Sequence, residues 1–251
     1  MVMRKIGIPA IILLILTAGF SNISFSQSES NLDGKILLRK ELAGHVLIHT
    51  SGWGLGFRKA KHISGYRKWF YEGEIVSFKD KKEVKMQNPF NNGKSYVFGK
   101  LNYVYNLRLG AGFQKEIHGK PYWGGVQIKY LYSIGASVAF LRPYYLYVYK
   151  IQKDMPSVLV EQTYNDTLSL DLIYGRGSLL SGFDKLKVSP GAYGRFALNF
   201  EFGKNDKRII ALEAGATFDC YFIPVAIMAN NTNKRFFFNL YLALQYGKRY
   251  N

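Results

Sequence analysis

The chain has 251 residues, a formal net charge of +17 and an aromatic share of 16%. Its single cysteine, Cys220, excludes an intramolecular disulfide. The four histidines are not spaced as metal ligands, so we expect no metal and no cofactor. The positive charge attracts polyanions, and for an exported chain we expect lipid and lipopolysaccharide head groups as partners, and no nucleic acid.

The first 26 residues have the pattern of a secretory signal peptide. Arg4 and Lys5 form its basic start, residues 6–20 form its apolar core, and residues 24–26 give a small-x-small cleavage site. Loss of the two leader charges leaves +15 on the mature chain. The apolar run is too short for an ordinary membrane-spanning helix, and no later stretch is long and apolar enough to be one. We predict export, with residues 27–43 as a periplasmic lead-in.

The rest of the chain, residues 44–251, is read as segments in which apolar side chains recur at every second position. This period of two is typical of β-strands. The predicted strands span residues 44–58, 66–79, 96–114, 122–141, 144–151, 191–202, 208–221 and 236–247. In the last strand one face is apolar throughout and the other is polar, aromatic and small, as in a strand with lipid outside and a polar lumen inside. We therefore predict an all-β fold: an eight-stranded antiparallel transmembrane β-barrel in the outer membrane.

An even number of strands puts both chain ends in the periplasm. The connection over residues 152–189 is then expected outside, and the connection over residues 80–94 in the periplasm. The latter is longer and more charged than a periplasmic turn requires, so we interpret it as a docking arm for a partner protein; a solvated, mobile hairpin is the alternative. Its candidate residues are Lys81, Lys82, Lys85, Pro89 and Phe90.

A second set of charged residues falls on the strand faces that should point into the barrel. An eight-stranded barrel is just wide enough for side chains to fill it. A lipid-facing arginine or lysine near the midplane would cost about 2–4 kcal/mol, so we expect a packed polar network inside and no ion conduction. The predicted members are Arg108, Lys129, Arg195, Glu201, Glu213 and Asp219.

The stretch His49-Thr50-Ser51 is a candidate catalytic pair. It resembles the His-x-Ser pair of lipid A 3-O-deacylases, in which histidine takes the serine proton and serine attacks an acyl ester. Read as one strand, residues 44–58 place both side chains on the lipid-facing side. The pair departs from that pattern because it lies on the first strand and because the nearest downstream acids are Glu72 and Glu74 on the next one. Polar residues at the membrane edge are the alternative interpretation.

Five short stretches share a family resemblance: residues 95–102 (SYVFGKLN), 106–108 (NLR), 174–176 (YGR), 187–194 (KVSPGAYG) and 211–215 (ALEAG). They resemble a family of largely uncharacterised outer-membrane β-barrel proteins from Bacteroidota. The resemblance covers most of the mature chain and implies an outer-membrane barrel without catalytic residues. That class is similar to accessory barrels of envelope machines, such as the barrel-assembly complex or the type 9 secretion apparatus.

The leading functional hypothesis is a non-enzymatic subunit or scaffold of an envelope complex in the cell outer membrane. A filled lumen, the lack of a convincing catalytic set and the charged connection at residues 80–94 favour it. Two alternatives remain open: a lipid A-modifying hydrolase that uses Ser51 and His49, and a soluble periplasmic lipid-binding barrel.

Overall fold

The computed structural model of the chain describes residues 39–119, 125–152, 155–165, 168–202, 207–229, 231 and 233–250. The predicted signal peptide and residues 27–38 of the predicted lead-in lie outside these residues, and residues 40–43 of the lead-in belong to the first strand. Within the described residues, no helix is both long and apolar enough to cross a membrane.

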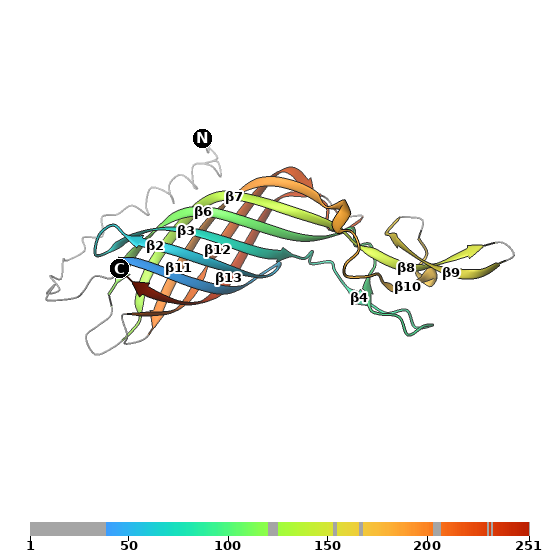
Figure 1. Cartoon of the computed structure of the whole chain (residues 1–251), viewed down its shortest axis with the longest axis horizontal. Coiled ribbons are helices and arrows are strands. Elements are labelled where there is room, and N and C mark those ends of the chain that lie inside the picture. The colour runs from blue at the N-terminus through green and yellow to red at the C-terminus, as the bar shows by residue number, and fades with distance from the viewer. Residues whose placement is uncertain are drawn as a thin grey trace, which may run out of the picture. The chain divides into compact units, whose positions relative to one another are not determined.

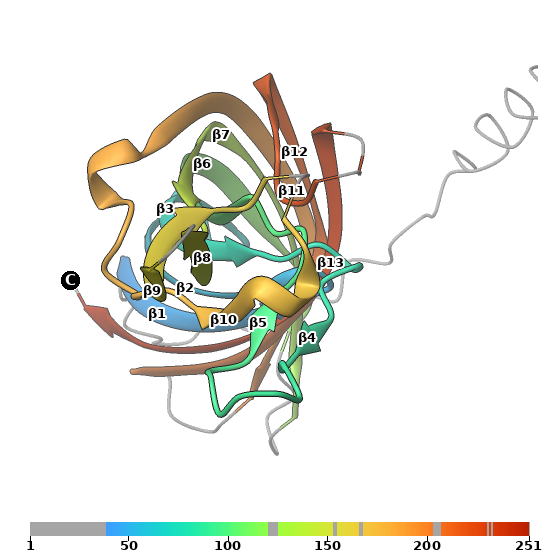
Figure 2. The same cartoon turned by 90° about the vertical axis from the view of Figure 1, so that its right-hand side faces the viewer.

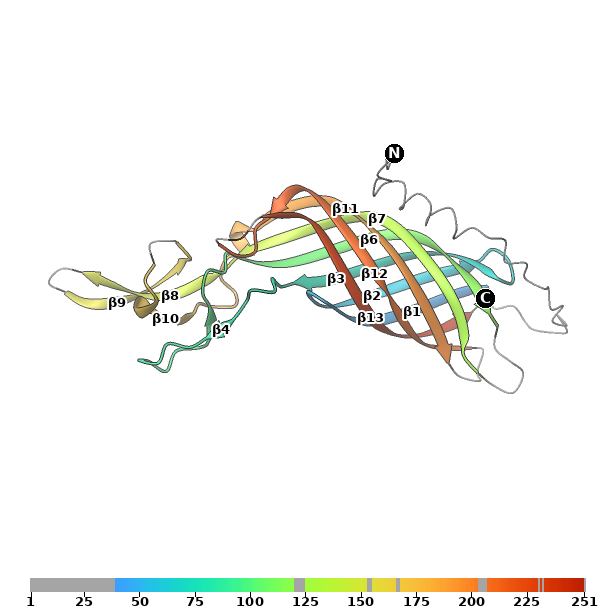
Figure 3. The same cartoon turned by 180° about the vertical axis from the view of Figure 1, so that it is seen from behind.

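Eight antiparallel strands close into a barrel, which confirms the predicted fold (Figures 1 and 3). Around the wall the order is β1-β13-β12-β11-β7-β6-β3-β2, so neighbours in the wall are neighbours along the chain, and β1 and β13 close it. The strands are β1 (Lys40–His49), β2 (Gly52–His62), β3 (Arg67–Phe78), β6 (Asn102–His118), β7 (Gln127–Pro143), β11 (Lys187–Phe202), β12 (Arg208–Val225) and β13 (Lys234–Tyr250).

The predicted strand at residues 44–58 is wrong, because a tight hairpin divides it. Only Thr50 and Ser51 separate β1 from β2, and His49 lies opposite Gly52 in the ladder. Paired residues point to the same face of a sheet, so inward positions are odd-numbered in β1 and even-numbered in β2. Gly52 has a φ of +155°, and a Cβ there would lie 2.0 Å from the Ser77 carbonyl oxygen. Gly52 can adopt this conformation and leaves room for the Ser77 carbonyl. It does not identify the turn in the sequence, because glycines also stand at alternate positions in the following strand.

The predicted fifth barrel strand, residues 144–151, is also wrong. This segment is β8 (Tyr145–Gln152), which pairs with β9 (Met155–Thr163) and β10 (Ile173–Arg176) in a separate three-stranded sheet. One strand was therefore missed and one added, and the total stayed at eight. A small apolar cluster stabilises the separate sheet; its buried members are Tyr96, Tyr144, Leu146, Val148 and Ile173.

The two ends of the barrel differ. We call the end with Lys40 and Tyr250, which pair across the closing strands, the terminal end, and the opposite end the distal end. The strand ends that join β2 to β3, β6 to β7 and β11 to β12 lie at the terminal end. Those that join β1 to β2, β3 to β6, β7 to β11 and β12 to β13 lie at the distal end. The distal connections carry β4 (Lys85–Met86), β5 (Tyr96–Val97) and the sheet of β8, β9 and β10, as seen from that end in Figure 2.

The barrel wall separates apolar from polar side chains. On β13 every second side chain from Phe236 to Tyr246 is apolar and exposed on the outside, and Leu244 is 68% exposed. The alternating residues, among them Asn239 and Tyr241, are buried inside. The other strands repeat this arrangement, so the outside of the wall is apolar and the charged side chains of its middle section point inward.

Candidate functional site

The centre of the barrel holds a cluster of ion pairs built on two glutamates of β3. Glu72 Oε2 accepts from Arg58 Nη2 at 2.8 Å and from Arg195 Nη1 at 3.1 Å. Arg195 also donates to Glu74. Arg58 reaches in the other direction, to Glu213 of β12, with Nη1 2.7 Å from Oε2. All five side chains are buried, so each charge depends on its neighbours because no bulk water screens it.

The cluster extends toward the distal end through Arg108 and Asp219. Arg108 donates through Nε and Nη2 to the two Asp219 carboxylate oxygens at 2.9 and 2.7 Å, the bidentate geometry of a strong ion pair. Glu74 lies 3.5 Å from Arg108 Nη1 and 2.7 Å from His45 Nε2. Hydroxyl groups satisfy further carboxylate oxygens; the donors are Ser133, Tyr193 and Tyr241.

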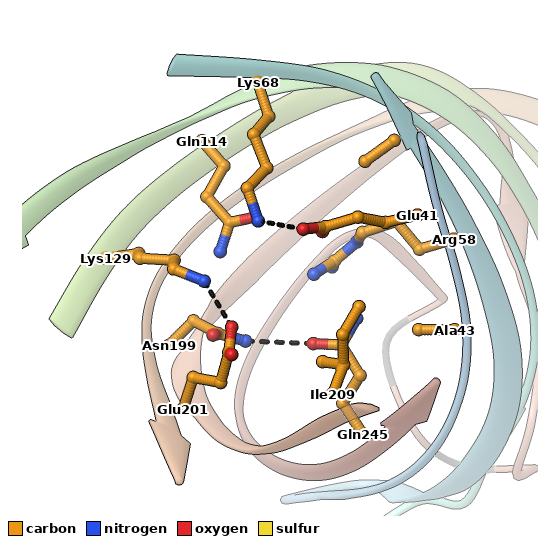
Figure 4. A pocket seen from close by; sticks show the side chains of 11 residues that line it. Glu41, Ala43, Arg58, Lys68, Gln114, Lys129, Asn199, Glu201, Ile209 and Gln245 are labelled. Carbon is orange, nitrogen blue, oxygen red and sulfur yellow. Dashed lines mark hydrogen bonds and ion pairs between the residues drawn. The ribbon is translucent and has the colours of Figure 1, made fainter. Parts of the chain in front are cut away.

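A second cluster fills the terminal end (Figure 4). Glu41 accepts from Lys68 Nζ at 2.5 Å and from Arg249 Nε at 2.6 Å. Arg249 Nη2 also donates to Glu201 at 2.6 Å, and Lys129 donates to the same carboxylate. The cavity between these side chains has a volume of about 10 Å³, roughly enough for one water molecule. Arg249 of β13 thus links β1 to β11 across the seam where the barrel closes.

The distal part of the interior is apolar and aromatic. The Phe78 and Phe237 rings stack with centroids 5.1 Å apart, and Tyr221 meets Phe237 at 5.7 Å. Side chains therefore occupy both halves of the interior. The geometry favours a packed core, and the absence of ion conduction stays a prediction.

The structure brings all six predicted lumen residues into the barrel interior, and each is buried. Four belong to the central cluster or its extension, and Lys129 and Glu201 belong to the terminal one. Sequence reasoning missed seven partners: Glu41, His45, Arg58, Lys68, Glu72, Glu74 and Arg249. The signal that could have found Arg58, Lys68, Glu72 and Glu74 is strand parity. The unrecognised hairpin reversed that parity for His45 in β1, and Glu41 and Arg249 lie outside the predicted strands.

The predicted outward orientation of His49 is wrong. His49 is an inward residue of β1, buried with its ring 5.5 Å from that of Phe78. Its Nδ1 accepts a hydrogen bond from the backbone N–H of Ser51 at 3.2 Å, while Ser51 Oγ donates to Asn239 Oδ1 at 2.6 Å. The serine hydroxyl is thus bonded to an amide and the imidazole to the backbone. This is a turn-stabilising arrangement rather than a nucleophile and its base.

Replacing Ser51 with alanine should leave lipid A chemistry unchanged, because Ser51 Oγ is committed to Asn239. Mass spectra of lipid A from cells that express the wild type or Ser51→Ala would test this, with an empty-vector strain as the control. An acyl chain lost only in cells with the wild-type protein would restore the hydrolase hypothesis.

The predicted docking arm lies at the distal end, which corrects the side that the strand count assigned to it. Its tip residue Phe90 is 84% exposed. Its lysines Lys81, Lys82 and Lys85 are also exposed. Two hydrogen bonds hold the arm against the rest of the distal end. Asn88 Nδ2 donates to the Ile173 carbonyl at 2.8 Å, and Lys100 Nζ donates to Glu83 at 2.6 Å. Burial lowers the pKa of Lys100, and the Glu83 contact opposes that shift.

Among the described residues, no group of three or more His, Cys, Asp or Glu side chains is placed to hold a metal ion. The polar clusters are instead closed sets of cations and carboxylates. Their chemistry is that of structural ion pairs, which stabilise the barrel interior.

Comparison with protein-family models and with curated protein sequences found no match. The predicted membership of a Bacteroidota barrel family therefore stays a prediction. Among solved structures, the chain is similar to Neisserial surface protein A, with 9% identity, a TM-score of 0.40, and 84% of this chain and 96% of that chain covered. It is also similar to Ail, the attachment invasion locus protein of Yersinia pestis, with 9% identity, a TM-score of 0.36, and 84% and 97% covered.

Proposed function

We propose that the chain is an integral outer-membrane barrel that acts as a non-enzymatic scaffold of a cell-envelope complex. The observation that carries the membrane assignment is the apolar outer wall. Ile134, in the middle of β7, is 73% exposed, and the exposed side chains of β13 are apolar from Phe236 to Tyr246. A water-soluble monomer rarely exposes so large a continuous apolar surface, whereas a bilayer requires it.

The distal end would then face the outside, because both ends of an outer-membrane barrel chain lie in the periplasm. This end carries folded structure beyond the wall. The two long connections hold each other: Arg176 donates its backbone N–H to the Lys94 carbonyl at 3.2 Å, and Asn88 reaches Ile173. We call residues 79–101 and 144–177 the distal extension. A folded extension on a packed barrel supports a binding role better than transport.

Purification of the tagged protein from its own membranes in mild detergent tests the scaffold role. We expect defined envelope proteins to co-elute at stoichiometric levels, identified by mass spectrometry. Replacing residues 150–158 with a short glycine turn should release them, because it shortens the hairpin of β8 and β9 and keeps the buried Leu146 and Val148. Lys61→Gln, an exposed change at the terminal end, is the matched control. A wild-type barrel that elutes alone would contradict the proposal.

A further inference from the structure

Residues 178–186, between β10 and β11, lie against the outer wall at the distal rim; we call them the rim segment. The Leu179 carbonyl accepts a hydrogen bond from Arg142 Nη1, and the Phe183 ring lies 4.8 Å from Arg142 Cζ. Gly182 allows the close fit: its φ is +89°, and a Cβ there would lie 3.1 Å from the Pro143 carbonyl oxygen. The segment is therefore held against the end of β7.

The rim segment turns its apolar side chains away from the protein. Leu180 is 81% exposed, and Leu179 and Phe183 are each more than half exposed. Lys185, two positions after Phe183, is also exposed. Apolar side chains next to lysines are typical of segments that lie at a membrane surface, where lysine stems run along apolar surface and the ammonium groups reach the head groups.

Arg142 lies beneath this segment with an unusual set of neighbours. It shares strand parity with Ile134 and so belongs to the outer face of β7, yet only 5% of it is exposed. Its guanidinium lies between two rings, with Cζ 4.7 Å from the centroid of Tyr103 and 4.8 Å from that of Phe183. Its Nε is buried and makes no hydrogen bond, and no carboxylate among the described residues forms an ion pair with it.

A buried guanidinium without a counter-ion is costly. The neighbouring cations add to that cost rather than relieve it. Lys100 Nζ lies 4.5 Å from the same Tyr103 ring, and its one carboxylate partner is Glu83. Asp184 is the single acid of the rim segment, and its side chain is exposed. Glu161 of β9 lies against the segment, but its carboxylate accepts from the Ser178 N–H and the Ser181 hydroxyl and forms no ion pair with Arg142. An anion from outside the chain would complete the charge balance at this rim.

We infer that the rim segment and Arg142 form a binding site for the phosphate head group of an outer-leaflet lipid. This rests on the proposed outer-membrane location. The Arg142 Nε–H has no partner and is the donor that we assign to the phosphate. Nη1 is already bonded to the Leu179 carbonyl, and the two rings hold the guanidinium in place. Lys185 adds a point charge near the surface. Leu179, Leu180 and Phe183 enter the acyl region beside the barrel.

The apolar side chains identify the source of the phosphate. A free phosphate ion would neutralise Arg142 but would leave three large apolar side chains in water. A lipid supplies both the anion and the apolar surroundings. The site therefore fits a phosphorylated lipid better than a soluble anion.

The test uses the full-length protein in phosphatidylcholine nanodiscs that hold a small share of bis-phosphorylated lipid A. Native mass spectrometry then counts the lipid A that each barrel retains. We expect Arg142→Gln to lower this retention about tenfold, the effect of losing a charge-assisted contact. Lys185→Gln should lower it by a smaller factor and needs no buried change. Lys59→Gln, an exposed lysine near the terminal end, should not alter it.

Two further arms separate the outcomes. Millimolar inorganic phosphate that displaces lipid A would show a free-anion site and overturn the lipid assignment. Equal retention by the wild type, Arg142→Gln and Lys185→Gln would overturn the site altogether. Carbonate extraction of native membranes is the separate check on location: a protein released without detergent contradicts the proposed function, whereas an embedded barrel without lipid A preference contradicts only this inference.

Discussion

Replacing Arg195 with leucine is expected to destabilise the barrel by about 3–5 kcal/mol, the cost of removing one partner from a buried ion pair. Arg195 contacts both Glu72 and Glu74. Without it, Arg58 and Arg108 are the two guanidinium groups left for the four carboxylates of the central cluster and its extension. The excess negative charge is buried and has no water to solvate it.

Urea unfolding in lipid vesicles, followed by tryptophan fluorescence, measures this loss as a lower midpoint. Adding Glu74→Gln to Arg195→Leu should restore part of the stability, because it removes one of the carboxylates left without a partner. Lys61→Leu is the surface control and should change stability by less than about 0.5 kcal/mol. An Arg195→Leu midpoint equal to that of the wild type would mean that the central ion pairs do not support the fold.

Replacing Ile134 with arginine should destabilise the membrane-embedded barrel by about 2–4 kcal/mol, the cost of a lipid-facing arginine near the bilayer midplane. Ile134 suits this test because it lies in the middle of β7 and is 73% exposed. Its side chain fills no interior space, so the substitution changes contact with the surroundings and leaves the core intact.

The same unfolding experiment includes Ile63→Arg as the matched control. Ile63 is exposed in the turn after β2, beyond the apolar part of the wall, so its substitution should cost about 0–1 kcal/mol. A soluble barrel would tolerate both substitutions equally, since surface changes in water alter stability by less than about 0.5 kcal/mol. Equal stability of the two variants would therefore favour the soluble alternative over a membrane protein.

The sequence by itself determined the fold class and the faces of most barrel strands. In β13, for example, Leu240, Leu242 and Leu244 were predicted on the outside with Asn239 and Tyr241 opposite, and the structure has them so. In a barrel of this size each strand has an apolar outer face and a polar inner face whose side chains fill the interior. Alternation is a local property, because the face of each residue follows from its neighbours two positions away. The six buried charges were found for the same reason.

Only the tertiary structure decided which alternating segments form the wall. β8 alternates like a wall strand because it also covers an apolar cluster, but its partners are β9 and β10. Thr50 and Ser51 turn the chain without the residues that usually mark a hairpin, and that turn reverses parity. Because the missed strand precedes it, the arm at residues 80–94 was assigned to the wrong end.

The pairing of charges was also beyond the sequence. Arg58 bonds Glu213 across 155 positions, and Arg108 bonds Asp219 across 111. Alternation shows that such side chains point inward, but the contacts depend on the register of several strands and on how the barrel closes. Arg142, on the outer face of β7, is a second example. Its parity predicts an exposed cation, but the fold of the rim segment buries it. Pattern determines the face of a residue, whereas its partners depend on which distant segments the closed barrel brings together.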